Sequence, residues 1–79
     1  MISMIEEYFV IYDKDNDVYM ERYDWGDGEV DEDSYSHPNQ VINYPTYEDA
    51  DAAREEYSNA DDLMVVRVTV TYQVEECQM

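Results

Sequence analysis

Residues 63–74 read LMVVRVTVTYQV and contain the clearest strand pattern in the sequence. From Met64 to Val74 every second residue is apolar, and the residues between them are mostly polar. Such alternation is typical of a strand that packs on one side of a sheet. At about 3.3 Å per residue, the strand would span about 40 Å. Because strands are usually shorter, we expect this one to bend, to overhang its neighbours or to pair with another chain.

Two further strands are predicted nearer the N-terminus. Residues 7–13 are rich in aromatic and β-branched side chains, which suit a half-buried pleated surface, and residues 18–25 resemble them. Residues 14–17 read KDND, and Asp and Asn favour turns because they tolerate left-handed backbone angles. The pattern predicts a β-hairpin.

Residues 26–40 form the least regular part of the chain and contain both glycines. We expect an irregular connection here, and a connection of about 15 residues without its own structure is uncommon unless it has a task. Residues 40–44 could add a short strand.

A helix is predicted after Pro45. Thr46 is a good N-cap, and Asp49 follows at the third position beyond it, as in a weak capping box. The helix should end at residue 57 or 58, with Asn59 as a left-handed stop. Four residues at helical spacing form a narrow apolar stripe: Tyr47, Ala50, Ala53 and Tyr57.

The predicted fold is therefore α+β, a small curved antiparallel sheet of three or four strands in the order ββ(β)αβ, packed on one helix. The 79 residues suffice for one domain, taken as residues 1–79. With 44% hydrophobic residues and nine tyrosines, the composition is that of a chain that folds rather than a disordered one.

The charge is strongly unbalanced, with 21 acidic residues, four Lys or Arg and a net charge of −17. This charge excludes direct electrostatic binding to nucleic acid or to acidic membranes. Cys77 is the single cysteine, so no internal disulfide can form. Because the sequence shows neither a signal peptide nor an apolar run long enough to span a bilayer, we expect a soluble cytoplasmic protein.

The acids are concentrated in the predicted turn, the predicted loop and the predicted helix. Carboxylates on alternate residues of an extended chain recur at about 6.5–7 Å, which approximates the spacing of phosphates along a nucleic-acid strand. Arginine binds carboxylates in the same planar, bidentate way as phosphates. The candidate partner-binding residues are Asp13, Asp15 and Asp17 in the turn, Asp24, Asp27, Glu29, Asp31, Glu32 and Asp33 in the loop, and Glu48, Asp49, Asp51, Glu55 and Glu56 on the helix.

Tyrosines lie near these acids and could stack on guanidinium groups in place of bases. They are Tyr19, Tyr23, Tyr35 and Tyr44. On the helix, Glu55 and Glu56 lie in the last predicted turn, where the helix dipole disfavours negative charge. Asp51 and Glu55 form a like-charge pair that only Arg54 relieves. We infer that something other than folding favours these acids, and that the surface imitates a polyanion.

In size, in α+β order and in its acid rows, the chain resembles the small acidic proteins with which bacteriophages inhibit host defence, especially anti-CRISPR proteins and other DNA mimics. Residues 24–33, which read DWGDGEVDED, and the acidic helix carry this resemblance. The resemblance implies a viral inhibitor, active in the cytoplasm of the infected cell, that binds the basic residues with which a CRISPR effector contacts target DNA.

Three other interpretations compete with this one. Residues 13–17 match the D-x-D-x-D opening of a calcium loop, but Val18 and Asp24 stand where that loop requires Gly and Glu, so at most weak divalent-cation binding is expected. A halophilic origin would explain the charge without any partner. Alternatively, the protein is a structural or interaction protein that assembles through its long strand, for example as a homodimer.

Enzymatic activity is not expected. His37 is the only histidine and precedes a proline in the irregular segment, and no nucleophile motif, phosphate-binding glycine loop or zinc-ligand spacing is present. Neither a cofactor nor a dedicated metal site is expected.

Overall fold

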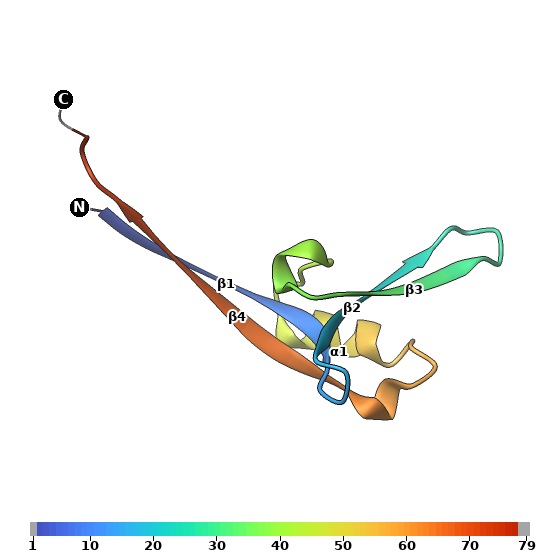
Figure 1. The fold of residues 1–79 in the computed structure, drawn as a ribbon. Helices are drawn as coiled ribbons and strands as arrows, with labels where there is room; N and C mark the ends of the chain where they lie inside the picture. Colours follow the sequence, from blue (N-terminus) through green and yellow to red (C-terminus); the bar gives the residue numbers. More distant parts are fainter. Residues whose placement is uncertain (1, 78–79) are drawn as a thin grey trace.

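The computed structural model describes residues 2–77, which form one antiparallel sheet, one α-helix and two short 3₁₀ helices (Figure 1). The sheet has the strand order β3-β2-β1-β4, and each pair of neighbours is antiparallel. This confirms the α+β class and the order ββ(β)αβ. In chain order the elements are β1 (Ile2–Asp13), β2 (Val18–Asp24), β3 (Val30–Tyr35), η1 (Pro38–Gln40), α1 (Tyr47–Arg54), η2 (Ala60–Asp62) and β4 (Leu63–Val74).

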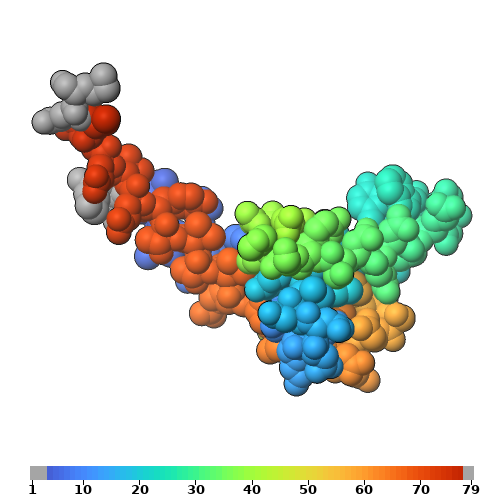
Figure 2. All heavy atoms as spheres, viewed as in Figure 1, coloured from blue at the N-terminus to red at the C-terminus, as the bar shows by residue number. Residues whose placement is uncertain are grey.

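The sheet divides into two parts because its strands pair over different lengths. β1 and β4 pair along their whole length, from Ile2 opposite Val74 to Asp13 opposite Leu63, whereas β2 pairs with β1 only at residues 11–13. Residues 2–7 and 69–74 therefore project from the rest of the molecule, and we call them the outer ribbon (Figures 1 and 2). The molecule measures 55 × 25 × 23 Å, and its radius of gyration of 15.7 Å exceeds the roughly 12 Å expected of a compact domain of this length.

The core lies at the other end of the sheet, where α1 covers β1 and β4. Ile11 is completely buried, and Tyr57 and Leu63 pack with it. The partly buried Met20, Tyr44 and Ala53 complete the cluster. Of the predicted helical stripe, Ala50 and Tyr57 are buried as expected, but Tyr47 is exposed and contacts the edge of the Phe9 ring at a centroid distance of 6.4 Å.

The predicted long strand exists over residues 63–74, and together with β1 it overhangs the other two strands. Its inner part is half-buried, but Tyr72 and Val74 are exposed, so the alternating pattern does not correspond to a packed face along the whole strand. The expected turn at 14–17 is also present, and Asp17 adopts the left-handed region with φ +54°.

Three strand predictions are corrected. β1 begins at Ile2 rather than at residue 7, because β4 supplies a partner along its whole length. β3 lies within the segment predicted to be irregular, where β2 provides its hydrogen-bonding partner. Residues 40–44 form no strand: only Tyr44 pairs with Phe9, through two backbone hydrogen bonds of 2.9 Å.

The start of the helix is as predicted, and its end is not. The Thr46 hydroxyl accepts a hydrogen bond from the backbone N–H of Asp49 at 3.1 Å. α1 ends at Arg54, because the backbone N–H groups of Glu56 and Tyr57 bind the carbonyls three residues earlier and tighten the chain into a turn. Asn59 has φ −113° and precedes η2, so it is not the left-handed stop. None of the helices in residues 2–77 has the length and apolar character needed to cross a bilayer.

Candidate functional site

The predicted acidic loop is in fact a second β-hairpin, formed by β2, β3 and the five residues between them. The backbone N–H of Trp25 donates to the carbonyl of Glu29 at 3.1 Å and closes the loop. Gly26 and Gly28 have φ of +83° and +92°, a region that side chains disfavour. The carboxylate of Asp24 accepts from the N–H of Gly26 at 2.9 Å, and Asp27 accepts from Glu29 at 3.1 Å. These bonds give the loop a defined shape.

The β2–β3 hairpin, residues 18–35, has two faces with different chemistry. Residues directly opposite each other on antiparallel strands point to the same face, and successive residues point to opposite faces. Arg22 lies opposite Glu32, and this pair defines the inner face, which is directed toward the chain that follows α1. Glu21 lies opposite Asp33, and Tyr23 lies opposite Asp31. These four residues define the outer face.

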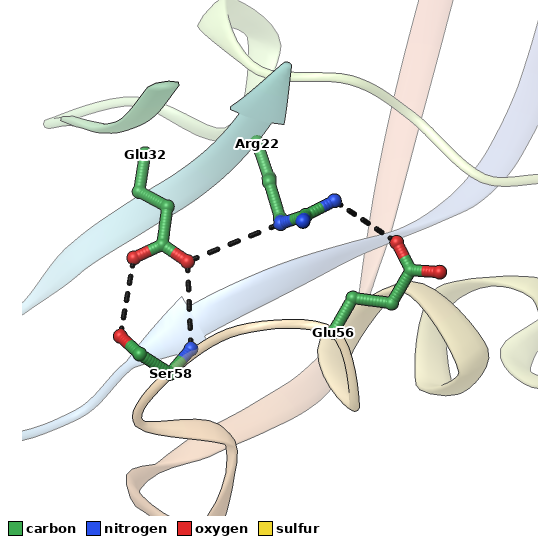
Figure 3. Close-up of polar contacts among 4 residues, drawn as sticks. All are labelled: Arg22, Glu32, Glu56 and Ser58. Carbon is green, nitrogen blue, oxygen red and sulfur yellow. Dashed lines mark hydrogen bonds and ion pairs between the residues drawn. The ribbon is translucent and has the colours of Figure 1, made fainter. Parts of the chain in front are cut away.

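The inner face is partly compensated, because it places one arginine beside two acids (Figure 3). Nη1 of Arg22 donates to Oε2 of Glu56 at 3.0 Å, and its Nε lies 4.0 Å from Oε2 of Glu32. Glu32 also accepts from the backbone N–H and the hydroxyl of Ser58, at 3.4 and 3.3 Å. One arginine therefore sits between two predicted site residues, and the contacts attach the hairpin to the helical layer.

The outer face has no such compensation. Glu21 and Asp33 face each other directly, at a Cβ separation of about 4.5–5.5 Å for opposed residues, and Asp31 follows two residues along β3. Within residues 2–77 no ion pair reaches any of these three carboxylates. Like charges that lie directly opposite each other destabilise a sheet. The arrangement is thus unfavourable for folding.

Aromatic side chains accompany these carboxylates. The rings of Tyr23 and Trp25 lie 4.5 Å apart between centroids, and Trp25 Nε1 donates to Oδ2 of Asp31 at 2.8 Å. Tyr23 is 51% exposed and Trp25 is 58% exposed. Flat aromatic rings and carboxylates that form no ion pair within residues 2–77 are therefore presented together. We call this surface the acidic–aromatic face, made up of Glu21, Tyr23, Trp25, Asp31 and Asp33.

Two of the three predicted turn acids, Asp13 and Asp17, accept hydrogen bonds from within the protein. Asp13 is buried, and its carboxylate accepts hydrogen bonds from the backbone N–H groups of Asp15 and Asn16 and from the side chain of Asn16. The Asn16 side chain is the main cause of the lowered pKa of Asp13. Asp17 accepts a 2.6 Å hydrogen bond from the hydroxyl of Tyr12, which raises the pKa of that tyrosine to about 12. Because its carboxylate is already engaged, Asp13 is left out of the contact surface proposed below.

This turn also bears on the calcium interpretation. Two of its three aspartates, Asp13 and Asp17, are engaged by the chain itself. In the part of the chain that the structure describes, no group of three or more Asp, Glu, His or Cys side chains is arranged to hold a metal ion.

The acids of the helix are partly compensated. Arg54 donates to Asp51 at 2.8 Å, which raises the arginine pKa, and lies 4.0 Å from Glu55. Glu48 and Asp49 occupy the first turn, which favours negative charge, and both are exposed. The acids of the helix are therefore less unfavourable for folding than the sequence alone indicates.

The structure separates the four tyrosines that were predicted to stack. Tyr19 and Tyr35 lie opposite each other on the same side of the hairpin as Tyr23. Tyr44 instead belongs to the core, and burial, with smaller contributions from the charges of Glu21 and Glu56, raises its pKa. Glu21 was not among the predicted site residues, because its importance depends on a partner strand that the sequence pattern does not reveal.

Comparisons with protein-family models, curated proteins and solved structures gave no match to this chain. The functional argument therefore rests on the geometry of the β2–β3 hairpin.

Proposed function

We propose that this protein is a non-enzymatic inhibitor that imitates nucleic-acid charge and occupies the DNA-binding groove of a basic partner. The acidic–aromatic face is its proposed contact surface. One observation carries the proposal: the inner face of the hairpin has Arg22 between its acids, whereas on the outer face Glu21 and Asp33 oppose each other with no cation from residues 2–77 paired to them. Carboxylates that nothing neutralises within the fold are free to meet positive charge from outside.

The chemistry of the face suits a groove that normally holds a phosphate backbone. Carboxylates accept paired hydrogen bonds from arginine in the planar geometry that phosphates also offer. Exposed aromatic rings provide surfaces on which guanidinium groups stack. Complementary charge also accelerates association with a basic partner, and this effect weakens with salt. Tyr23 and Trp25 are placed beside the carboxylates for such contacts.

The proposed partner is a CRISPR effector complex, the class that the resemblance to phage inhibitors implies. Binding at the residues that read target DNA would block the effector without any catalytic step. The net charge of −17 argues against direct binding to the DNA itself. The inhibitor and the DNA should therefore compete for one groove rather than form a ternary complex.

The test compares two double variants that each remove two negative charges. Asp31→Asn/Asp33→Asn alters the acidic–aromatic face, and Asp61→Asn/Asp62→Asn alters two exposed acids of η2 that belong to neither proposed surface. Each variant is titrated against a panel of guide-loaded CRISPR effectors bound to fluorescent duplex DNA. We expect the unmodified protein to displace DNA from at least one effector. The first variant should require roughly tenfold more protein and the second less than about twofold more, since close charge pairs at interfaces contribute about a kcal/mol or more each.

Two outcomes contradict the proposal. If no effector in the panel loses its DNA, the proposed partner class is wrong. If both double variants act equally, the hairpin is not the contact surface. Circular dichroism and urea unfolding of both variants establish that a loss of competition is not a loss of folding.

A further inference from the structure

Among the residues that the structure describes, the outer ribbon leaves a long strand edge and several apolar side chains without a partner. Residues 2–7 pair with residues 69–74, and this two-stranded segment extends away from α1 and from the β2–β3 hairpin (Figures 1 and 2). Met4 is 52% exposed and Ile5 is 67% exposed, and Tyr72 and Val74 are exposed on the other strand. An isolated two-stranded ribbon is marginal in water. The exposed edge and the exposed apolar side chains therefore favour pairing with a further strand.

The outer edge of β4 also lacks the features with which proteins protect exposed strands. Natural edge strands carry lysines, prolines, bulges or inward-pointing charges that prevent pairing with another chain. β4 pairs with β1 in one unbroken register, without a bulge, and Arg67 is its only charged residue. Although the chain has 21 acids among 79 residues, none falls in these twelve positions. β4 is therefore a strand edge that another strand of similar chemistry can approach.

We propose that β4 pairs antiparallel with β4 of a second copy, centred on Thr71, to form a dimer with a continuous sheet β1-β4-β4-β1. This inference does not rest on the proposed function. Centring on Thr71 places Val68 opposite Val74 and Val70 opposite Tyr72 of the second copy, so that the apolar side chains of both copies share one face. It also places Arg67 opposite Glu75 of the second copy, twice by symmetry. Opposite charges across strands stabilise a sheet.

Neighbouring registers lack this match. Centring on Val70 sets Arg67 opposite Gln73, and centring on Tyr72 sets it opposite Cys77, so neither pairs the cation with an acid. A shift by one residue in the pairing would bring the apolar residues of one copy onto the polar face of the other. Pattern and charge thus favour one register.

Repulsion between the two acidic copies also favours dimerisation through the edge of β4. In the antiparallel arrangement the two bodies point away from each other, and the two Leu63 residues are about 50 Å apart along the sheet. This separation is several Debye lengths at physiological salt, so the acidic hairpins repel only weakly. The outer edge of β1 is a poorer site, because it carries Glu6 and Glu7 and is interrupted where Phe9 pairs with Tyr44.

The first test locates the register by disulfide formation. In a Cys77→Ser background, single cysteines are introduced as Val70→Cys, Thr71→Cys and Tyr72→Cys and oxidised with glutathione. Only the residue on the twofold axis faces itself at a distance that a disulfide can span. We expect Thr71→Cys to give at least about fivefold more covalent dimer than either neighbour. Equal cross-linking at all three positions, or a maximum at another position, overturns the proposal.

The second test measures the dimer itself by sedimentation equilibrium. Arg67→Glu and Glu75→Arg should each raise the dissociation constant about 3- to 30-fold, since two cross-strand pairs are affected, and the double variant should recover most of the loss. Lys14→Glu, which makes the same charge change as Arg67→Glu in the distant turn, should leave the constant within about twofold. A protein that stays monomeric at millimolar concentration, or a double variant that shows no recovery, overturns the proposal.

Discussion

The β2–β3 hairpin and the outer ribbon extend from the same small core, yet they are opposite in chemistry. Residues 18–35 contain seven acids and one arginine, whereas the outer ribbon contains only two acids, Glu6 and Glu7, both on β1, and β4 contains no acid. The hairpin exposes carboxylates that repel one another, and the ribbon exposes apolar side chains on an unprotected strand edge. Each arrangement is unfavourable for an isolated monomer, in a different way.

This difference bears on the reason for the charge. If the acids served only to keep the protein soluble, they would be most useful on the exposed edge of β4, where association is easiest. They are instead placed on the hairpin, where Glu21 and Asp33 already oppose each other. The distribution favours a specific role for the acids over general solvation. The two proposed contact surfaces, one for a basic partner and one for a second copy of the chain, would account for both regions.

The largest effect is expected from two isoleucines of the same strand. Ile11 is completely buried in the core, and Ile5 is 67% exposed in the outer ribbon. Ile11→Ala should reduce the free energy of unfolding by about 2–5 kcal/mol, because it leaves a cavity in a small core. Ile5→Ala should cost less than about 0.5 kcal/mol in the monomer. Urea unfolding at low micromolar concentration measures both.

The outcome decides whether the two regions differ in packing. Equal losses for the two variants would show that the ribbon is packed as tightly as the body, which contradicts the comparison. A larger cost of Ile5→Ala at high protein concentration alone would instead report the dimer.

The sequence reveals those parts of the fold that local patterns determine. The strand at 63–74, the KDND turn and the N-cap Thr46 each follow from residues adjacent in sequence. β3 could not be predicted in this way, because three consecutive acids and two nearby glycines have low strand propensity, and the strand forms through pairing with β2. Tertiary context overrides local preference here.

The same limit applies to the candidate site. The sequence identifies Asp31 and Asp33 as acids on alternate residues, and this alternation can be recognised without knowing the partner strand. That Glu21 opposes Asp33, while Glu32 lies 4.0 Å from Arg22, depends on the register between β2 and β3. The burial of Asp13 likewise depends on the turn closing around its carboxylate. Charge density is visible in the sequence, but its compensation is not.

The second prediction tests the compensation of the inner face. Arg22→Gln should lower stability by about 1–2 kcal/mol, because Glu32 and Glu56 lose their shared cation. Arg67→Gln removes the same charge from β4, where Arg67 lies over the Phe9 ring at 5.8 Å from its centroid. It should lower stability by about half as much as Arg22→Gln, or less. Thermal unfolding of both variants provides the measurement. If Arg67→Gln costs as much as Arg22→Gln, the effect reflects net charge and not the contacts of the inner face.

The third prediction distinguishes acids engaged by the fold from those that are not. The pKa of Tyr12 is raised to about 12, chiefly because its hydroxyl donates to Asp17. The protonated hydroxyl is thus favoured in the folded state, and this stability is present below pH 10 and lost as the pH rises through about 12. Asp17→Asn should move the pKa of Tyr12 toward its usual value of 10, as followed by tyrosinate absorbance against a Tyr12→Phe reference. Asp15→Asn, in the same turn, should leave it in place, and an equal change in both variants would point to the charge of the turn as a whole.

The smallest effect, and the one closest to the proposed function, concerns Glu21. Glu21→Gln removes the repulsion with Asp33 and should increase stability by about 0.2–1 kcal/mol, which is unusual for a change in a half-buried strand residue. Because the cause is repulsion between charges, the gain should shrink as added salt screens it. Glu48→Gln, at the N-terminal end of α1 where negative charge is favourable, is the matched control and should be neutral or slightly destabilising.

The halophilic interpretation predicts a different salt dependence of the unmodified protein. A halophilic protein would unfold in dilute buffer, whereas this chain should remain folded there.

If Glu21→Gln weakens displacement of DNA while it strengthens the fold, the carboxylate serves binding at the expense of stability. If Glu21→Gln instead lowers stability, Glu21 has a structural partner and does not belong to the acidic–aromatic face.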